Sequence, residues 1–210
     1  MAAVTTDDVS ASTGPAVRLA GLACWVAGVL GAASGVFLAV YPAEGSDDTW
    51  RYPLSADGFA AIQAWFGIQH VGLLLGVLAL LGRGAFRGSR AGRLGVWAAT
   101  AGLAILAVTE LLAITARHAD LDEYAYLNGL YGVSSTLAGA GLVAAGVAVR
   151  RAGVWLGWRS WIVLVTGVWV FVPMFPAMAA GFLPARLGIT GWMLTFAALG
   201  WALWREEDTR

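Results

Sequence analysis

Long apolar stretches alternate with short polar segments along the chain, and six of the stretches are long enough to cross a bilayer. A transmembrane helix needs about 20 residues for a hydrocarbon core of roughly 30 Å. The stretches are continuously apolar, which favours helices, because the strands of a membrane barrel alternate in polarity. They are Val17–Tyr41, Gly58–Leu81, Leu94–Ala116, Tyr124–Val149, Trp161–Phe182 and Leu187–Trp204. The pattern predicts an all-α fold, a polytopic integral membrane bundle of six transmembrane helices.

The segments at the two ends of the chain are polar. Asp7 and Asp8 stand where a cleavable signal peptide carries positive charge, so we expect the first span to remain as a helix. The predicted domains are a disordered cytoplasmic tail at 1–16, the transmembrane domain at 17–204 and a cytoplasmic tail at 205–210. Three prolines are expected to lie in loops outside the spans: Pro42, Pro53 and Pro184.

Composition and charge agree with a protein whose solvent is largely lipid. Hydrophobic residues make up 59% of the chain and charged residues only 12%, whereas soluble domains carry about 25% charged residues. The 13 basic and 13 acidic residues cancel, so no bulk attraction to nucleic acid is expected. Cys24 is the single cysteine, which excludes a disulfide or a thiolate metal site within one chain.

Arginines predict the orientation of the bundle, since the chain contains no lysine. The loops after the first, third and fifth spans hold Arg51, Arg117 and Arg186, and the other ten arginines lie on the opposite side. The positive-inside rule therefore places both termini in the cytoplasm, as in a multi-pass protein of the cell membrane. Membrane lipids are the expected surroundings of the bundle.

Two glycine pairs, Gly31/Gly35 and Gly72/Gly76, have the spacing that lets helices approach closely. Packing inside the bundle is the favoured interpretation of both pairs, and oligomerisation through either pair is the alternative.

Chemistry has to be inferred from polar residues inside the spans, because the familiar nucleotide-binding, zinc-protease and serine-hydrolase motifs are missing. Glu110 is the acidic residue that falls well within a span, roughly 10 Å from the outer end of its helix. An unpaired carboxylate there costs several kcal/mol, so Glu110 must find partners or take up a proton.

Other polar and aromatic residues fall at the same depth on the second and fourth spans. They are Gln63, Phe66 and His70 on the second span and Asn128, Tyr131 and Ser135 on the fourth. If these helices flank the third, the side chains converge on Glu110 in the outer half of the bundle. Glu110 and His70 are the candidate catalytic residues, and the others are candidate binding residues.

Two further residues complete the predicted site. Arg117 lies two helical turns beyond Glu110, where it would gate the site or bind an anion, and Trp169 would line an apolar pocket. Pro173 and Pro176 interrupt the fifth span in its outer half, either as an ordinary kink or as the border of a cavity. No metal or cofactor is expected, because His118 lies roughly 18 Å in depth from His70.

The residues favour a membrane-embedded enzyme that performs acid/base chemistry on a lipophilic substrate, such as an isoprenoid or another lipid. An isomerase- or cyclase-like reaction needs only an acid and a shaped apolar pocket, here open to the outer half of the bilayer. The alternatives are an accessory subunit of a membrane complex, in which Glu110 joins helices, and a proton-coupled small-solute carrier. The inner half of the bundle lacks a polar path, which argues against the carrier.

Overall fold

The computed structural model describes residues 14–205, and every regular element in that range is helical. Six helices are long and apolar enough to cross a membrane, as the sequence predicts. The predicted tails at 1–13 and 206–210 lie outside the described residues. The helices are α1 (Pro15–Val40), α2 (Ala56–Arg83), α3 (Arg90–Ala113), α4 (Ala125–Ala152), α5 (Arg159–Trp169), α6 (Phe175–Ala179) and α7 (Phe182–Trp204).

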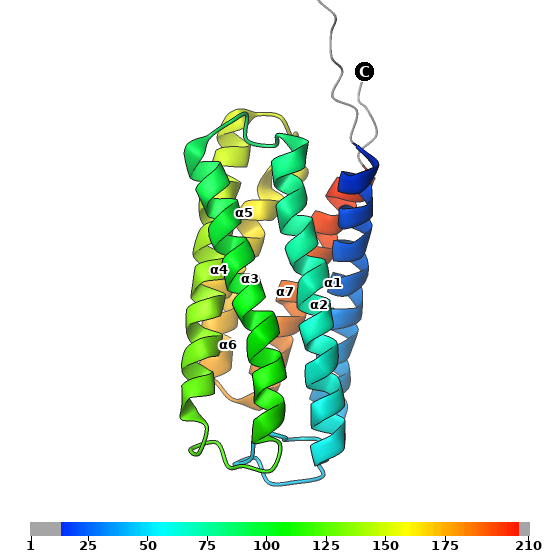
Figure 1. Cartoon of the computed structure of the whole chain (residues 1–210), viewed down its shortest axis with the longest axis vertical. Coiled ribbons are helices and arrows are strands. Elements are labelled where there is room, and N and C mark those ends of the chain that lie inside the picture. Colours follow the sequence, from blue (N-terminus) through cyan, green and yellow to red (C-terminus); the bar gives the residue numbers. More distant parts are fainter. Residues whose placement is uncertain (1–13, 206–210) are drawn as a thin grey trace, which may run out of the picture.

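The helices form a closed ring in which each one packs against its neighbours in the sequence (Figure 1). The ring closes because α7 returns to pack along α1. The third span therefore lies between the second and the fourth, as the predicted site requires. The first and last described residues lie at the same end, here called the terminal end, and the opposite end is called the distal end.

Glycine allows the closest helix contacts of the ring. A Cβ at Gly28 of α1 would lie 2.5 Å from the backbone nitrogen of Ala197 in α7, and one at Gly102 of α3 equally close to that of Ala138 in α4. The two glycine pairs singled out in the sequence also face helices of the same chain; a Cβ at Gly76, for example, would lie 2.4 Å from that of Cys24. These glycines thus serve packing within the bundle, and oligomerisation through them stays a prediction.

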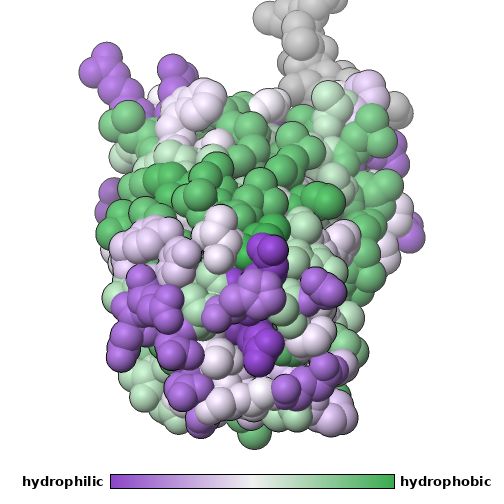
Figure 2. Space-filling model, turned by 60° about the horizontal axis from the view of Figure 1, so that its bottom comes forward, coloured by the Kyte–Doolittle hydropathy of each residue, from purple (hydrophilic) through white to green (hydrophobic). Residues whose placement is uncertain are grey.

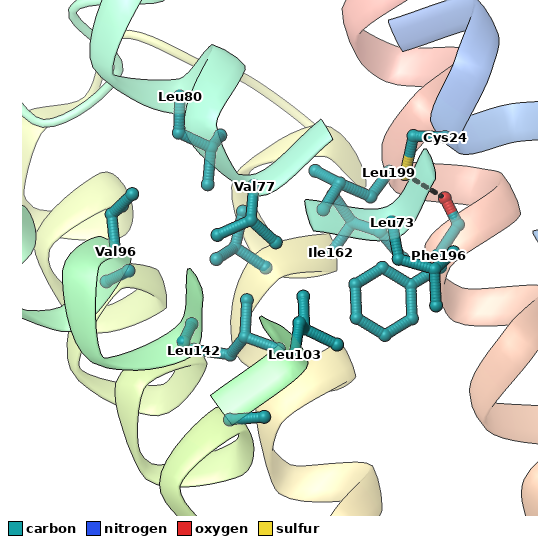
Figure 3. Close-up of a cluster of buried hydrophobic side chains, with 14 of the residues drawn as sticks. Cys24, Leu73, Val77, Leu80, Val96, Leu103, Leu142, Ile162, Phe196 and Leu199 are labelled. Carbon is teal, nitrogen blue, oxygen red and sulfur yellow. Dashed lines mark hydrogen bonds between the residues drawn. The ribbon is translucent and has the colours of Figure 1, made fainter. Parts of the chain in front are cut away.

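The half of the bundle nearer the termini is filled by apolar side chains (Figure 3). Leu73, Leu103, Leu142 and Phe196 are fully buried there, contributed by four different helices. Cys24 belongs to this core and donates a hydrogen bond from its thiol to the carbonyl of Phe196 at 3.4 Å. The interior therefore offers no polar route through this part of the described chain.

The last helix begins earlier than the sequence pattern indicates. The structure starts α7 at Phe182, five residues before the predicted sixth span, so Phe182 does not end the fifth span. Pro184 lies in the first turn of α7 and not in a loop, because the first-turn backbone nitrogens of a helix have no intrahelical acceptor to lose. Arg186 is consequently a helical residue and not a loop residue. The first helix likewise begins at Pro15, inside the segment expected to be a disordered tail.

The fifth span is interrupted at the predicted place. Between α5 and α6 the chain forms one π-helical turn, Val170–Met174, which contains Pro173. A proline cannot donate the regular helical hydrogen bond, and the wider turn accommodates the loss. The interruption separates two packing arrangements, because α5 packs on α4 whereas α6 contacts α7 and not α4.

Two loops cover the distal end of the ring. The α1–α2 loop pairs with the α3–α4 loop through backbone bonds from Trp50 N to Ala119 O at 3.3 Å and from Leu121 N to Asp48 O at 2.9 Å. The Tyr52 ring also contacts the Phe182 ring of α7, with centroids 4.9 Å apart. Figure 2 shows hydrophilic side chains gathered over this end and, on the face in view, hydrophobic side chains along the helices next to it.

Candidate functional site

A cavity of about 460 Å³ lies inside the distal half of the ring. Every one of the six spans and the α1–α2 loop contributes to its wall. Its polar lining residues are Gln63, Gln69, His70, Glu110, Asn128, Tyr131, Ser135 and Arg186. Its larger apolar and aromatic lining residues are Trp50, Phe59, Phe66, Leu106, Met174, Phe175, Met178, Ile189, Trp192 and Met193.

Glu110 lies in the last full turn of α3 and is 7% exposed. Its Oε2 accepts two hydrogen bonds, from Gln63 Nε2 of α2 at 2.9 Å and from the Tyr131 hydroxyl of α4 at 2.7 Å. Gln63 Nε2 also donates to the Tyr131 oxygen at 3.0 Å. The three side chains form a closed triangle that joins three helices and fixes the orientation of the carboxyl group.

The other oxygen of Glu110 is open to the cavity. Oε1 has no hydrogen-bond partner among the described residues, and protein atoms do not seal it off. Because Oε2 already accepts two donors, a proton bound to this carboxyl group belongs on Oε1. The triangle therefore directs the acidic position of Glu110 into the cavity.

His70 lines the deeper part of the same cavity and is 6% exposed. Its Nδ1 lies 2.7 Å from the carbonyl oxygen of Phe66, one helical turn earlier. A carbonyl only accepts, so Nδ1 donates and the neutral ring leaves Nε2 as a hydrogen-bond acceptor. No hydrogen bond joins His70 to Glu110 in the part of the chain that the structure describes.

Two of the predicted site residues lie away from the cavity. Arg117 donates to the carbonyl of Ile114 at 3.2 Å, and Trp169 donates from its ring to the carbonyl of Gly188 at 2.9 Å. Regular helix ends before Arg117, in the short 3-10 turn Ile114–Ala116, so helical spacing from Glu110 no longer sets its direction. The Trp169 ring instead packs against α7 beside Gly191, where an added Cβ would lie 2.2 Å from the ring.

The cavity wall includes further residues that the sequence analysis did not assign to the site, among them Trp50, Gln69 and Arg186. Gln69 is 3% exposed and donates to the Met193 sulfur at 2.7 Å. Gln69 is a polar residue next to His70 within a span, which is the same pattern that identifies Gln63 and His70 as candidates. Trp50 carried no such signal, because its position depends on the pairing of two loops.

Arg186 enters the cavity wall because α7 begins at Phe182. Its guanidinium lies 5.0 Å from the centroid of the Phe182 ring, and it interacts electrostatically with Glu110. The two charged groups are not in contact, since none of the guanidinium nitrogens lies within 4.0 Å of a Glu110 carboxylate oxygen. Proline within the first three residues of an apolar run is typical of a helix start, and that signal would have placed Arg186 on the helix.

The cavity opens at the side of the bundle. Most lining residues are buried or half-buried, and the exposed ones are Asn128 and Gly132 of α4 and Met178 of α6. No Cα atom of α4 lies within 8 Å of a Cα atom of α6, and a Cβ at Gly132 would meet nothing within 4 Å. The covered distal end and the apolar terminal half leave the gap between α4 and α6 as the open side.

Within residues 14–205, no three His, Cys, Asp or Glu side chains come together as a metal site would require. Comparisons with protein-family models, with curated proteins and with solved structures give no match to this chain. Function is therefore inferred from the cavity and the carboxyl group directed into it.

Proposed function

We propose that the chain is a multi-pass enzyme of the cell membrane, with both termini in the cytoplasm, that performs acid/base chemistry on a lipophilic substrate. The observation that carries the proposal is the geometry of Glu110. One carboxyl oxygen is held by Gln63 and Tyr131, and the other is free in an otherwise largely apolar cavity. A positioned acid in a shaped apolar pocket is sufficient for isomerase- or cyclase-like reactions.

The proposed reaction is initiated by a proton from Glu110. Oε1–H donates its proton to one carbon of a carbon–carbon double bond, whose electron pair forms the new C–H bond. The resulting carbocation is stabilised by aromatic ring faces, for which Phe66 and Trp192 of the wall are suited. A neighbouring C–H bond then breaks, its electrons form the new double bond, and the proton returns to the carboxylate. The substrate is isomerised without an oxidant or reductant.

The size and access of the cavity support a lipophilic substrate. A volume of about 460 Å³ lies within the range of about 300–1,000 Å³ that small-molecule sites occupy. The opening between α4 and α6 faces the side of the bundle, which is the lipid side for a ring of membrane-spanning helices. A hydrocarbon molecule can reach Glu110 by this path without passing through water.

An accessory subunit is the second candidate function. The triangle of Gln63, Glu110 and Tyr131 joins α2, α3 and α4, as a purely structural contact between helices would. In that case Glu110 needs no substrate, and its free oxygen has no role. A carrier is the least favoured, because the apolar core fills the terminal half of the described bundle.

Deuterium incorporation tests the proposed activity. The protein, reconstituted in lipid nanodiscs, is incubated in D₂O with geranylgeraniol and with a lipid extract of the expression host, and the lipids are analysed by mass spectrometry. Solvent deuterium is expected at carbon positions next to a double bond. The Glu110→Gln variant should abolish this incorporation, whereas Glu123→Gln, in the exposed α3–α4 loop, should retain it. Incorporation that is absent, or equal in wild type and Glu110→Gln, would contradict the proposal.

A further inference from the structure

The guanidinium of Arg186 in the cavity wall has no hydrogen-bond acceptor among the described residues. Its Nε is closed off by protein atoms, as is Nε1 of the neighbouring wall residue Trp50. Its two terminal nitrogens are not sealed off by protein atoms and have no partner among the described residues. Buried polar groups are almost always paired, so this unpaired cation beside a cavity indicates a ligand that supplies the acceptor.

Glu110 does not supply the missing hydrogen-bond acceptor of Arg186. The two groups attract each other electrostatically but are not in contact, and the bonds from Gln63 and Tyr131 hold Oε2 in its own position. The guanidinium lies near the face of the Phe182 ring. Its N–H groups donate to no acceptor among the described residues. A guanidinium in this state is suited to a carboxylate or a phosphate, both of which it binds through paired hydrogen bonds.

The guanidinium lies at one end of the cavity, and the apolar lining continues to the open side. Arg186 lies in the second turn of α7, which begins at the distal end. Phe175 and Met178 of α6 line the cavity toward the gap beside α4. The wall is thus polar and electropositive under the distal cover and apolar toward the side.

We infer that the ligand of this cavity is an anionic amphiphile, whose carboxylate or phosphate group binds Arg186 and whose hydrocarbon tail extends past Phe175 and Met178 toward the gap between α4 and α6. The inference rests on the proposed function for the reaction at the tail, where the double bond lies near Glu110. Binding of the anionic group does not depend on turnover. An experiment can therefore contradict the anionic-ligand inference without contradicting the proposed acid/base function.

Three probes with the same tail test the inference: farnesyl phosphate, farnesoic acid and farnesol. Their binding to the full chain is measured by titration calorimetry in nanodiscs of phosphatidylcholine, which carries no net charge. At least one anionic probe should bind about 10- to 100-fold more tightly than farnesol, as a hydrogen-bonded charge does relative to a neutral group. The tighter of the two identifies the head group as phosphate or carboxylate.

Substitutions identify the residue that causes the preference for an anionic probe over farnesol. Arg186→Gln should remove the preference, because the amide carries no charge. Arg186→Lys keeps the charge without the planar pair of donors, so it should reduce the preference severalfold. Arg186→Lys also keeps the test decisive if Arg186→Gln does not fold. Arg51→Gln changes an arginine of the distal loop that does not line the cavity, and it should bind as wild type does.

The outcomes separate this inference from the proposed function. Equal binding of all three probes, or an anionic preference that survives Arg186→Gln, would overturn the inference and leave the acid/base proposal in place. Failure of all three probes to bind would overturn both. Glu110→Gln should bind the anionic probes at least as tightly as wild type, because the amide, like the protonated carboxyl group, carries no negative charge. Weaker anion binding by this variant would contradict the placement of the head group at Arg186.

Discussion

Replacing Glu110 by methionine and by glutamine should change stability very differently. Methionine removes the acceptor of two hydrogen bonds, so one N–H of Gln63 and the hydroxyl of Tyr131 lose their partner. Each buried unpaired donor costs about 1–3 kcal/mol, which predicts a loss of about 2–6 kcal/mol in the free energy of unfolding. Gln63 and Tyr131 keep the bond between them, so the lower part of that range is expected.

Glutamine retains an acceptor oxygen at the position of Oε2, and its amide nitrogen takes the place of the free Oε1 in the cavity. Both hydrogen bonds survive, and the predicted change in the free energy of unfolding is below about 1 kcal/mol. Unfolding is followed by circular dichroism as sodium dodecyl sulfate is added to protein in non-ionic detergent. Equal destabilisation by the two substitutions, or a methionine variant as stable as wild type, would refute the assigned hydrogen bonds.

Two further stability predictions follow from the same structure. Gly102→Ala places a Cβ 2.5 Å from the Ala138 backbone nitrogen and should destabilise the bundle by about 1–3 kcal/mol, whereas Gly132→Ala meets nothing within 4 Å and should be neutral or stabilising by up to about 1 kcal/mol. Thermal unfolding of the two variants tests this prediction. A Gly132→Ala variant that is less stable than Gly102→Ala would contradict the α3–α4 packing. Tyr131→Phe removes the 2.7 Å bond to Glu110 and should cost about 1–3 kcal/mol in the sodium dodecyl sulfate titration; no loss would contradict the assigned hydrogen bond.

Six spans and the polar surroundings of Glu110 were predictable because both depend on local properties of the sequence. Apolar run length determines which segments are long enough to cross a membrane, and helical rise determines the depth of each polar residue. Gln63, Glu110 and Tyr131 therefore fall at matching depths once their helices are neighbours. The sequence does not show that these helices are neighbours, whereas the ring order of the described helices does.

The remaining parts of the site depend on where helices end and on contacts between distant segments. Arg117 was placed by helical spacing, but regular helix ends before it. Arg186 was assigned to a loop because Pro184 was interpreted as a helix breaker, although proline is tolerated in a first turn. Trp50 reaches the cavity through loop pairing with residues near Ala119, about which apolar periodicity contains no information.

Chemical labelling of Glu110 tests the central claim most directly, that its free carboxyl oxygen faces a cavity open to the lipid side. A hydrophobic carbodiimide reacts with protonated carboxyl groups that it can reach from an apolar phase, and peptide mass spectrometry locates the product. We expect modification at Glu110 in wild type and strong protection in Gly132→Phe, whose ring would fill the gap between α4 and α6. An unmodified Glu110, or equal labelling in both proteins, would contradict the account.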